Sequence, residues 1–248
     1  MTNHFSALGF NVHSKHELGA LANYALQEGA QIESLNGDYI WWSPGRGIEL
    51  WFQINPQKRV MGMNPHFSHN ARMRVGLTQL IARPTFNMME GAFYGWANPQ
   101  ENSEGDYPFV FDLPDFDLQR HLSLPAVKEV QIAAFAHELT IFANESNYEA
   151  SQSQLAPQAF VPVGLFQKIE GEEIPKDVGP TAMGVLSGRI ISTEQLKNPF
   201  TNLPFHWAKV ETFGGEVDMV VAPELVTTDL TVGGIVQGTF WLSGRIQP

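Results

Sequence analysis

The pentapeptide Leu-Ser-Gly-Arg-Ile occurs twice near the end of the chain, at residues 186–190 and 242–246. Side chains alternate between the two faces of a strand, so each copy places Leu, Gly and Ile on one face and Ser and Arg on the other. A glycine inside a strand usually marks strong bending or a close approach of backbones, and a small barrel needs both. The repeat therefore predicts two adjacent strands, the first and the last of a small β-barrel.

A hairpin is predicted between the two copies, over residues 205–221, because two consecutive glycines at its centre supply the positive φ angles of a tight turn. The expected register places the Glu211 and Asp218 side chains opposite each other. Like charges directly opposite are unfavourable, so a compensating cation is expected beside them. Arg189 is the first candidate.

The segment before these strands is predicted to divide the chain. Residues 171–180 are charged, contain Pro and Gly and show no periodicity, which is typical of a linker. They separate a predicted first domain, residues 1–170, from a predicted second domain, residues 181–248. The second domain is expected to be a small β-barrel that resembles an OB-fold in size and layout, and such an architecture does not fix a function.

A capping box predicts where the first helix begins. Ser14 is the expected N-cap and Glu17 follows three residues later. Apolar side chains recur at helical spacing between Leu18 and Leu26, and Gly29 is the expected C-cap. The pattern predicts one amphipathic helix near the amino terminus.

Strands are predicted on both sides of this helix, at residues 4–12, 31–35, 39–43 and 48–54, which gives a β-α-β-β-β start. Residues 127–143 suit a buried strand or a helix, and periodicity alone does not separate the two. Their β-branched and aromatic content favours a strand. The expected fold class is α+β and β-rich: an antiparallel sheet with one packed helix, followed by the small OB-like β-barrel.

The order of the first elements resembles one module of the vicinal oxygen chelate (glyoxalase-like) superfamily. The matching residues are His4 on the first predicted strand and Glu49 in the sequence Ile-Glu-Leu-Trp-Phe on the last. The resemblance implies that both are metal ligands of a metal-dependent enzyme. It covers about a fifth of the chain, and the family pattern requires a second module, whereas no second capped amphipathic helix follows residue 58.

Two further histidines, His66 and His69, have a spacing that brings two imidazoles together if the segment forms a helical turn. With His4 or Glu49 nearby, three nitrogen or oxygen ligands could hold zinc or another divalent ion. The alternative is a pair of surface histidines without a ligand. No organic cofactor is predicted, and a divalent metal remains one of the hypotheses.

Aromatic side chains are concentrated in the first domain, and adjacent pairs among them point to opposite faces of one strand. Solvent-exposed tryptophans in such numbers are unusual, so the aromatic side chains that do not face the helix side of the sheet are expected to be covered by something else. Core or domain packing, a subunit interface and a ligand pocket are the three explanations. The residues considered for ligand binding are Trp42, Trp51, Tyr94, Trp96 and Trp241.

The net charge of −11 disfavours nucleic acid as a partner, because an acidic chain repels phosphate backbones. The opposing hypothesis is single-stranded nucleic-acid binding by the C-terminal barrel. In that hypothesis Trp241 stacks on bases, and Arg189, Lys209 and Arg245 contact phosphates.

The chain contains no cysteine, which fits a reducing compartment. Its amino terminus lacks a basic segment followed by an apolar one, so no signal peptide is expected. No stretch approaches the roughly 18 uninterrupted apolar residues of a membrane span. The sequence therefore predicts a soluble, cytoplasmic protein.

No catalytic motif of high specificity is present: the sequence lacks a Gly-x-Ser-x-Gly elbow, a Walker loop and a complete zincin motif. The favoured hypothesis is a non-catalytic binding or protein-interaction module whose partner is an unknown protein or small molecule. A second copy of the chain, in a homo-oligomer, is a further candidate partner. The alternatives are the metal-dependent enzyme of glyoxalase-like type and the nucleic-acid-binding barrel.

Overall fold

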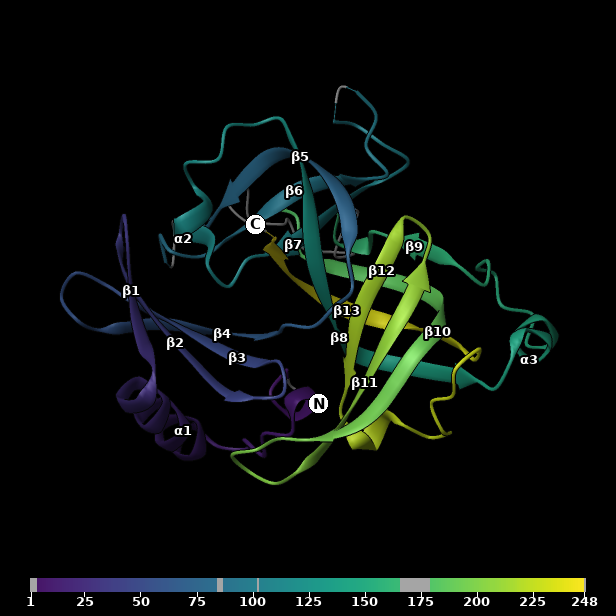
Figure 1. Cartoon of the computed structure of the whole chain (residues 1–248), viewed down its shortest axis with the longest axis horizontal. Coiled ribbons are helices and arrows are strands. Elements are labelled where there is room, and N and C mark those ends of the chain that lie inside the picture. Colours follow the sequence, from purple (N-terminus) through teal and green to yellow (C-terminus); the bar gives the residue numbers. More distant parts are fainter. Residues whose placement is uncertain (1–3, 84–86, 102, 166–178, 248) are drawn as a thin grey trace, which may run out of the picture.

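The computed structural model describes residues 4–83, 87–101, 103–165 and 179–247 and is rich in β-strands with few helices (Figure 1). A four-stranded antiparallel sheet contains β1 (Ala30–Ser34), β2 (Gly37–Gly45), β3 (Ile48–Ile54) and β4 (Val60–Phe67). A nine-stranded mixed sheet contains β5 (Met73–Ala82), β6 (Gly91–Ala97), β7 (Pro108–Asp112), β8 (Ala126–Phe142), β9 (Ala159–Val161), β10 (Met183–Lys197), β11 (Pro204–Thr212), β12 (Gly215–Val221) and β13 (Ile235–Ile246). The helices are α1 (Lys15–Glu28), α2 (Phe116–Gln119) and α3 (Glu145–Ala150), with 3₁₀ turns at Ser6–Leu8, Val163–Leu165 and Pro223–Leu225.

Helix α1 begins where the capping box predicts. The Ser14 side chain accepts a hydrogen bond from the Glu17 backbone N at 3.2 Å, and the Glu17 carboxylate accepts one from the His13 backbone N at 2.8 Å. Leu21 and Ala25 are its buried residues. The helix lies on the outer side of the four-stranded sheet (Figure 1).

The predicted strands 31–35, 39–43 and 48–54 are confirmed as β1, β2 and β3, whereas the strand predicted over residues 4–12 is wrong. In its place the chain forms a 3₁₀ turn at Ser6–Leu8 that ends at Gly9, whose φ of 71° is left-handed. Ala7 and Leu8 are buried by this turn. Burial rather than strand pairing therefore accounts for the apolar residues there.

The four-stranded sheet has two different faces. Ile48, Leu50 and Phe52 of β3 belong to the same core cluster as Leu21 and Ala25 of α1. The alternate side chains Glu49, Trp51 and Gln53 lie on the opposite face and are also buried, at 6%, 2% and 0% exposed. That second face therefore carries polar groups that need partners inside the protein.

The nine-stranded sheet closes into a ring through extra pairings of β11 with β10 and of β8 with β13, and it is not the small OB-like barrel that the sequence predicts. Strand β8 is the reason. It pairs in parallel with β12 and antiparallel with both β13 and β5, so the C-terminal strands close only with a strand from the predicted first domain. The predicted strand over residues 127–143 is confirmed, with 17 residues in β8.

The two pentapeptide copies lie on neighbouring antiparallel strands, β10 and β13, but not opposite each other. Leu186 pairs with Gly238 and Gly188 with Val236, whereas Gly244 pairs with Ile132 of β8. Both faces of the strands are covered, so Ser187 and Ser243, on the face opposite the Leu and Ile side chains, are 0% and 1% exposed. Gly188 lies against Val210 and Glu211, whereas Gly244 lies against Phe111 and Ile132, so the two glycines meet different neighbours.

The hairpin of β11 and β12 is confirmed with a different register. Its turn has two residues, so Glu211 pairs with Glu216, and Asp218 pairs with Lys209 rather than with Glu211. Arg189 is the register partner of Glu211 on β10, although its guanidinium binds Glu145 at 2.6 Å.

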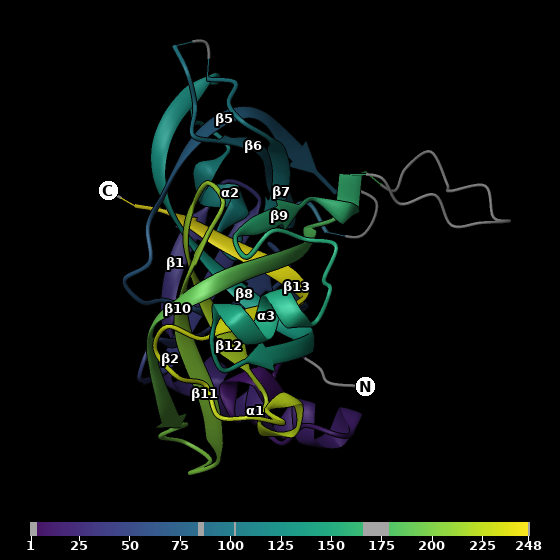
Figure 2. The ribbon, with the colours of Figure 1, turned by 90° about the vertical axis from the view of Figure 1, so that its right-hand side faces the viewer.

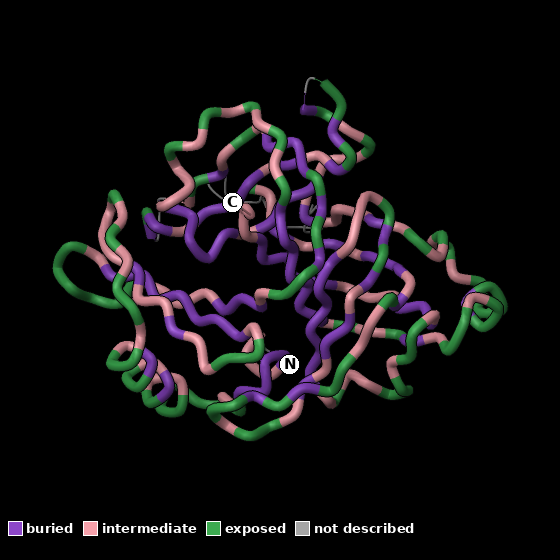
Figure 3. The backbone as a smooth tube through the Cα atoms, in the orientation of Figure 1, coloured by how far each residue is buried: buried purple, intermediate pink, exposed green. Residues whose placement is uncertain are grey.

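Most of the predicted linker, residues 171–178, lies outside the described residues, and the division into two domains stays a prediction. The described strands on both sides of it belong to one sheet, and the buried residues are continuous where β8, β12 and β13 meet (Figure 3). Seen from the side, β10 crosses over β8 and β13 with α3 beside them (Figure 2). Among the described residues, no helix has the length and hydropathy to cross a membrane.

Gly244→Ala is expected to lower the free energy of unfolding by about 1–3 kcal/mol, because overpacking forces neighbours to move. A Cβ there would lie 2.3 Å from Phe111 Cδ2 and 3.0 Å from Ile132 Cδ1. The matched control is Gly19→Ala in α1, where nothing lies within 4 Å. That change should raise the free energy of unfolding, measured by urea denaturation, by about 0.5–1 kcal/mol. Equal effects of the two variants would contradict this packing at Gly244.

Candidate functional site

Two of the four predicted metal ligands are neighbours. Glu49 on β3 and His66 on β4 are cross-strand partners on the polar face of the four-stranded sheet. Each has other partners, however. The Glu49 carboxylate accepts a hydrogen bond from Trp51 Nε1 at 2.8 Å and lies 3.3 Å from the Arg245 guanidinium.

The other two, His4 and His69, are directed elsewhere. The His4 ring stacks on Trp241 at 4.1 Å, and its Nε2 lies 2.8 Å from that of His137. The His69 ring packs on Trp207 at 4.1 Å. Within the described ranges no group of three or more His, Asp or Glu side chains is arranged to hold a metal ion. The structure therefore does not bring the predicted metal set together.

His66 belongs instead to a buried polar network that joins the two sheets. Its Nδ1 lies 2.9 Å from Ser243 Oγ and its Nε2 lies 2.9 Å from Gln131 Oε1. Because the amide oxygen only accepts, Nε2 carries the proton and Nδ1 accepts from Ser243. The Gln131 Nε2 then donates to Asp218 at 2.8 Å and to the Phe67 carbonyl at 3.0 Å. All four polar side chains are at most 1% exposed, so the network is closed to solvent.

Burial is the main electrostatic effect in this network. It lowers the pKa of His66 to about 3, with the nearby Arg245 charge as a second cause. It raises the pKa of Asp218, an effect partly offset by hydrogen bonds from Gln131, Trp207 and Ala71. His66 is therefore neutral and buried, so it links the two sheets and does not reach a substrate.

The cations assigned to phosphates in the nucleic-acid hypothesis are each engaged by carboxylates. Arg189 binds Glu145 at 2.6 Å and Lys209 lies 3.3 Å from Glu216. Arg245 lies between Glu49 and Asp115 and over the Trp51 ring at 4.9 Å. These contacts give the nucleic-acid hypothesis no support.

The five aromatic residues considered for binding lie in separate places. Trp51 is enclosed by Tyr39, Trp41 and Arg245. Trp241 is 9% exposed, under His4, and donates to Asp112 at 2.7 Å. The remaining three are Trp42, which packs near Phe200, and Tyr94 and Trp96, half-buried neighbours on β6 with ring centroids 6.3 Å apart.

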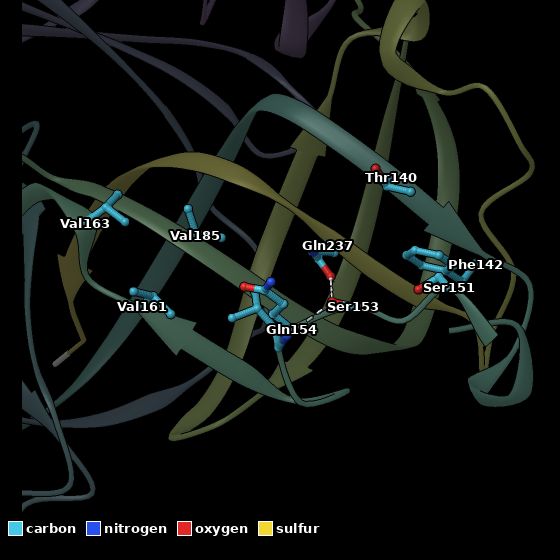
Figure 4. Close-up of a pocket in the computed structure, with 10 residues that line it drawn as sticks. Thr140, Phe142, Ser151, Ser153, Gln154, Val161, Val163, Val185 and Gln237 are labelled. Atoms are coloured by element: carbon cyan, nitrogen blue, oxygen red, sulfur yellow. Dashed lines mark hydrogen bonds between the residues drawn. The ribbon is translucent and has the colours of Figure 1, made fainter. Parts of the chain in front are cut away.

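A cavity of about 670 Å³ lies over the nine-stranded sheet, where β8, β9, β10 and β13 meet the segment that follows α3. Its apolar wall includes Phe142 of β8, Val161 of β9 and Val185 of β10, together with Val163 and Leu155. The valines lie at one end and Phe142 at the other, with Gln237 and Ser153 between them (Figure 4). Several hundred cubic ångströms is the size of a small-molecule site.

Gln237 of β13 is the polar centre of this cavity. Its Oε1 accepts from Ser153 Oγ at 2.6 Å and lies 2.9 Å from the hydroxyl of Tyr148, which is 2% exposed. With the amide oxygen on this side, the Gln237 Nε2 has no hydrogen-bond partner in the described part of the chain. The cavity thus offers an amide hydrogen-bond donor beside an apolar wall.

The other polar side chains of the cavity are uncharged: Thr140, Ser151, Ser153 and Gln154. None of the lining residues that the structure describes is an Asp, Glu, Lys, Arg or His. Neither serine therefore has a base beside it in the lining, which nucleophilic catalysis requires. The lining suits binding rather than acid-base chemistry.

Few features of the sequence indicate this cavity. Its lining comes from five separate segments between residues 140 and 237, and none of those segments carries a recognisable motif. Thr140 of β8 and Gln237 of β13 are register partners. Both strands carry further polar residues, such as Glu138 on β8 and Arg245 on β13, so the sequence does not distinguish these two.

Comparison of the chain with protein-family models, with curated proteins and with solved structures gives no match. What the protein does must therefore be inferred from its own side chains.

Proposed function

We propose that the protein is a non-catalytic binding protein that takes an uncharged, partly apolar small molecule into the cavity at Gln237. The observation that carries the proposal is a cavity of about 670 Å³ whose lining combines apolar side chains with uncharged hydrogen-bonding groups. Ligand pockets are typically mostly apolar, with a few polar groups that fix orientation.

The ligand that fits has a hydrogen-bond acceptor next to an apolar body. The acceptor would bind the Gln237 Nε2, while the amide oxygen keeps its hydrogen bonds from Ser153 and Tyr148. The apolar body would lie against Val161, Val185 and Phe142. A charged group would be desolvated there without an opposite charge, which is unfavourable.

Nile red, an uncharged dye that fluoresces in apolar surroundings, tests the cavity. Wild-type protein is expected to raise and blue-shift its emission, and Val185→Trp, which fills the cavity, is expected to weaken binding at least about tenfold. The matched control is Val127→Trp, because Val127 is another strand valine, 37% exposed and outside the cavity. Circular dichroism checks that both variants fold.

Two results would overturn the proposal. One is the absence of any dye response in the wild type. The other is a Val185→Trp variant that folds and binds the dye as tightly as Val127→Trp does. Weaker binding in Val185→Trp alone supports the cavity as the site.

A further inference from the structure

A second cavity, of about 460 Å³, lies at the other side of the molecule, where the end of α1 and the strand β2 meet the turn between β10 and β11. Tyr24, Trp42 and Phe200 line it, together with Pro44, Pro199 and Glu28. It shares no residue with the cavity at Gln237. Its chemistry is therefore independent of the function proposed above.

Three aromatic rings form one cluster in this cavity. The Tyr24 ring centroid lies 5.7 Å from that of Trp42 and 4.8 Å from that of Phe200, and the Trp42 and Phe200 rings are 5.3 Å apart and nearly perpendicular, at 88°. Trp42 is 7% exposed, whereas Tyr24 and Phe200 are 44% and 43% exposed. The buried Trp42 ring thus supports the rings of Tyr24 and Phe200, which remain open to solvent.

The charge of the cavity has one sign. Glu28 is the only acidic lining residue, and no Lys, Arg or His is among the lining residues that the structure describes. Aromatic faces carry negative potential and attract cations, and a carboxylate beside them adds to that attraction. The overall charge of −11 acts in the same direction.

The chemistry of the lining also bears on the kind of cation. A primary ammonium needs several hydrogen-bond acceptors when it leaves water. The lining offers it the Glu28 carboxylate and the Tyr24 and Ser43 hydroxyls, whereas the Trp42 and Phe200 rings and the two prolines offer none through their side chains. A quaternary ammonium has no N–H group, and aromatic rings are its usual partners in proteins.

We propose that the cavity formed by Tyr24, Trp42, Phe200 and Glu28 binds an organic cation that carries a quaternary ammonium group. The methyl groups contact the Tyr24 and Phe200 rings, and the Glu28 carboxylate balances the charge. The rest of the ligand extends into solvent through the open side of the two exposed rings.

Choline and 3,3-dimethylbutan-1-ol are the probes, because the second replaces the ammonium nitrogen by carbon and keeps the shape. Isothermal titration of the full chain up to about 10 mM choline is expected to show saturable binding, and the neutral alcohol is expected to bind at least about fivefold more weakly. A higher salt concentration should weaken the binding of choline, because salt screens the attraction between charges.

Three variants locate the site. Tyr24→Leu and Phe200→Leu are each expected to weaken choline binding roughly 2- to 30-fold, the range that single cation–π contacts span. Glu28→Gln should weaken choline and leave the neutral alcohol unchanged. Phe213→Leu is the matched control, since Phe213 is 49% exposed and packs on Tyr107 away from this cavity.

The proposal is overturned if choline gives no heat in this range, or if the neutral alcohol binds as tightly as choline. It is also overturned if Tyr24→Leu and Phe200→Leu keep the wild-type affinity. Because the dye test concerns the cavity at Gln237 and the choline test concerns this one, failure of either leaves the other standing.

Discussion

Replacement of Asp218 by alanine is expected to lower the free energy of unfolding by about 3–5 kcal/mol. The carboxylate is 0% exposed and accepts hydrogen bonds from Trp207 Nε1 at 3.0 Å, Gln131 Nε2 at 2.8 Å and the Ala71 backbone N at 3.1 Å. Alanine would leave these three donors in the core without that acceptor. A buried donor without a partner costs roughly 1–3 kcal/mol.

Asp218→Asn is the control for this prediction. It keeps the volume and one oxygen that accepts, so its stability is expected to lie between those of the wild type and the alanine variant. Urea denaturation followed by circular dichroism measures all three. An alanine variant within about 0.5 kcal/mol of the wild type would mean that Asp218 does not organise the donors as described.

Local signals predicted the elements whose stability is local. The side chains of Ser14 and Glu17 cap α1 within one turn, and the turn after Ser34 joins two neighbouring strands, so both could be read from adjacent residues. The turn at Ser6–Leu8 could not, because its apolar residues are buried by distant segments: the Leu8 carbonyl, for example, accepts from Asn198 Nδ2 at 2.8 Å.

Pairing over long sequence distances accounts for most of the fold that the sequence did not predict. Strand β8 has the composition of a buried strand, but nothing in it indicates that it would pair with β12 in parallel and with β13 antiparallel.

The register of the β11 and β12 hairpin is a separate error. Its turn differs by two residues from the predicted one, so the cross-strand partner of Asp218 is Lys209 instead of Glu211. Register errors of this kind change every side-chain partner.

The candidate sites show the same limit. His66 was singled out because a second histidine follows three residues later, yet its partners are Ser243 and Gln131, which are 177 and 65 positions away in the sequence. Spacing identifies metal ligands only when neighbouring residues share a site. Here residues on two other strands hold the imidazole, so the spacing of histidines in the sequence does not indicate this arrangement.

Acid is expected to destabilise the folded chain through His66, the second large effect. The unfolded chain binds a proton at this imidazole below pH 6.5, whereas burial lowers the pKa in the folded state to about 3. Between these values unfolding takes up a proton, so the free energy of unfolding falls as the pH falls. From pH 6.5 to about 4.5 the loss from this one group is about 2.3 kcal/mol, because the slope approaches about 1.36 kcal/mol for each pH unit only when the imidazole of the unfolded chain is fully protonated.

His66→Gln isolates that contribution. The variant lacks the titrating group, so it is expected to be less stable than the wild type near neutral pH and to approach it as the pH falls toward 4. His4, whose pKa burial lowers to about 4, acts in the same direction in both proteins and cancels in the difference. Urea denaturation at several pH values between 7 and 4 gives the two slopes. Parallel slopes would show that folding does not lower the pKa of His66, and the closed network with Ser243 and Gln131 would then be incorrect.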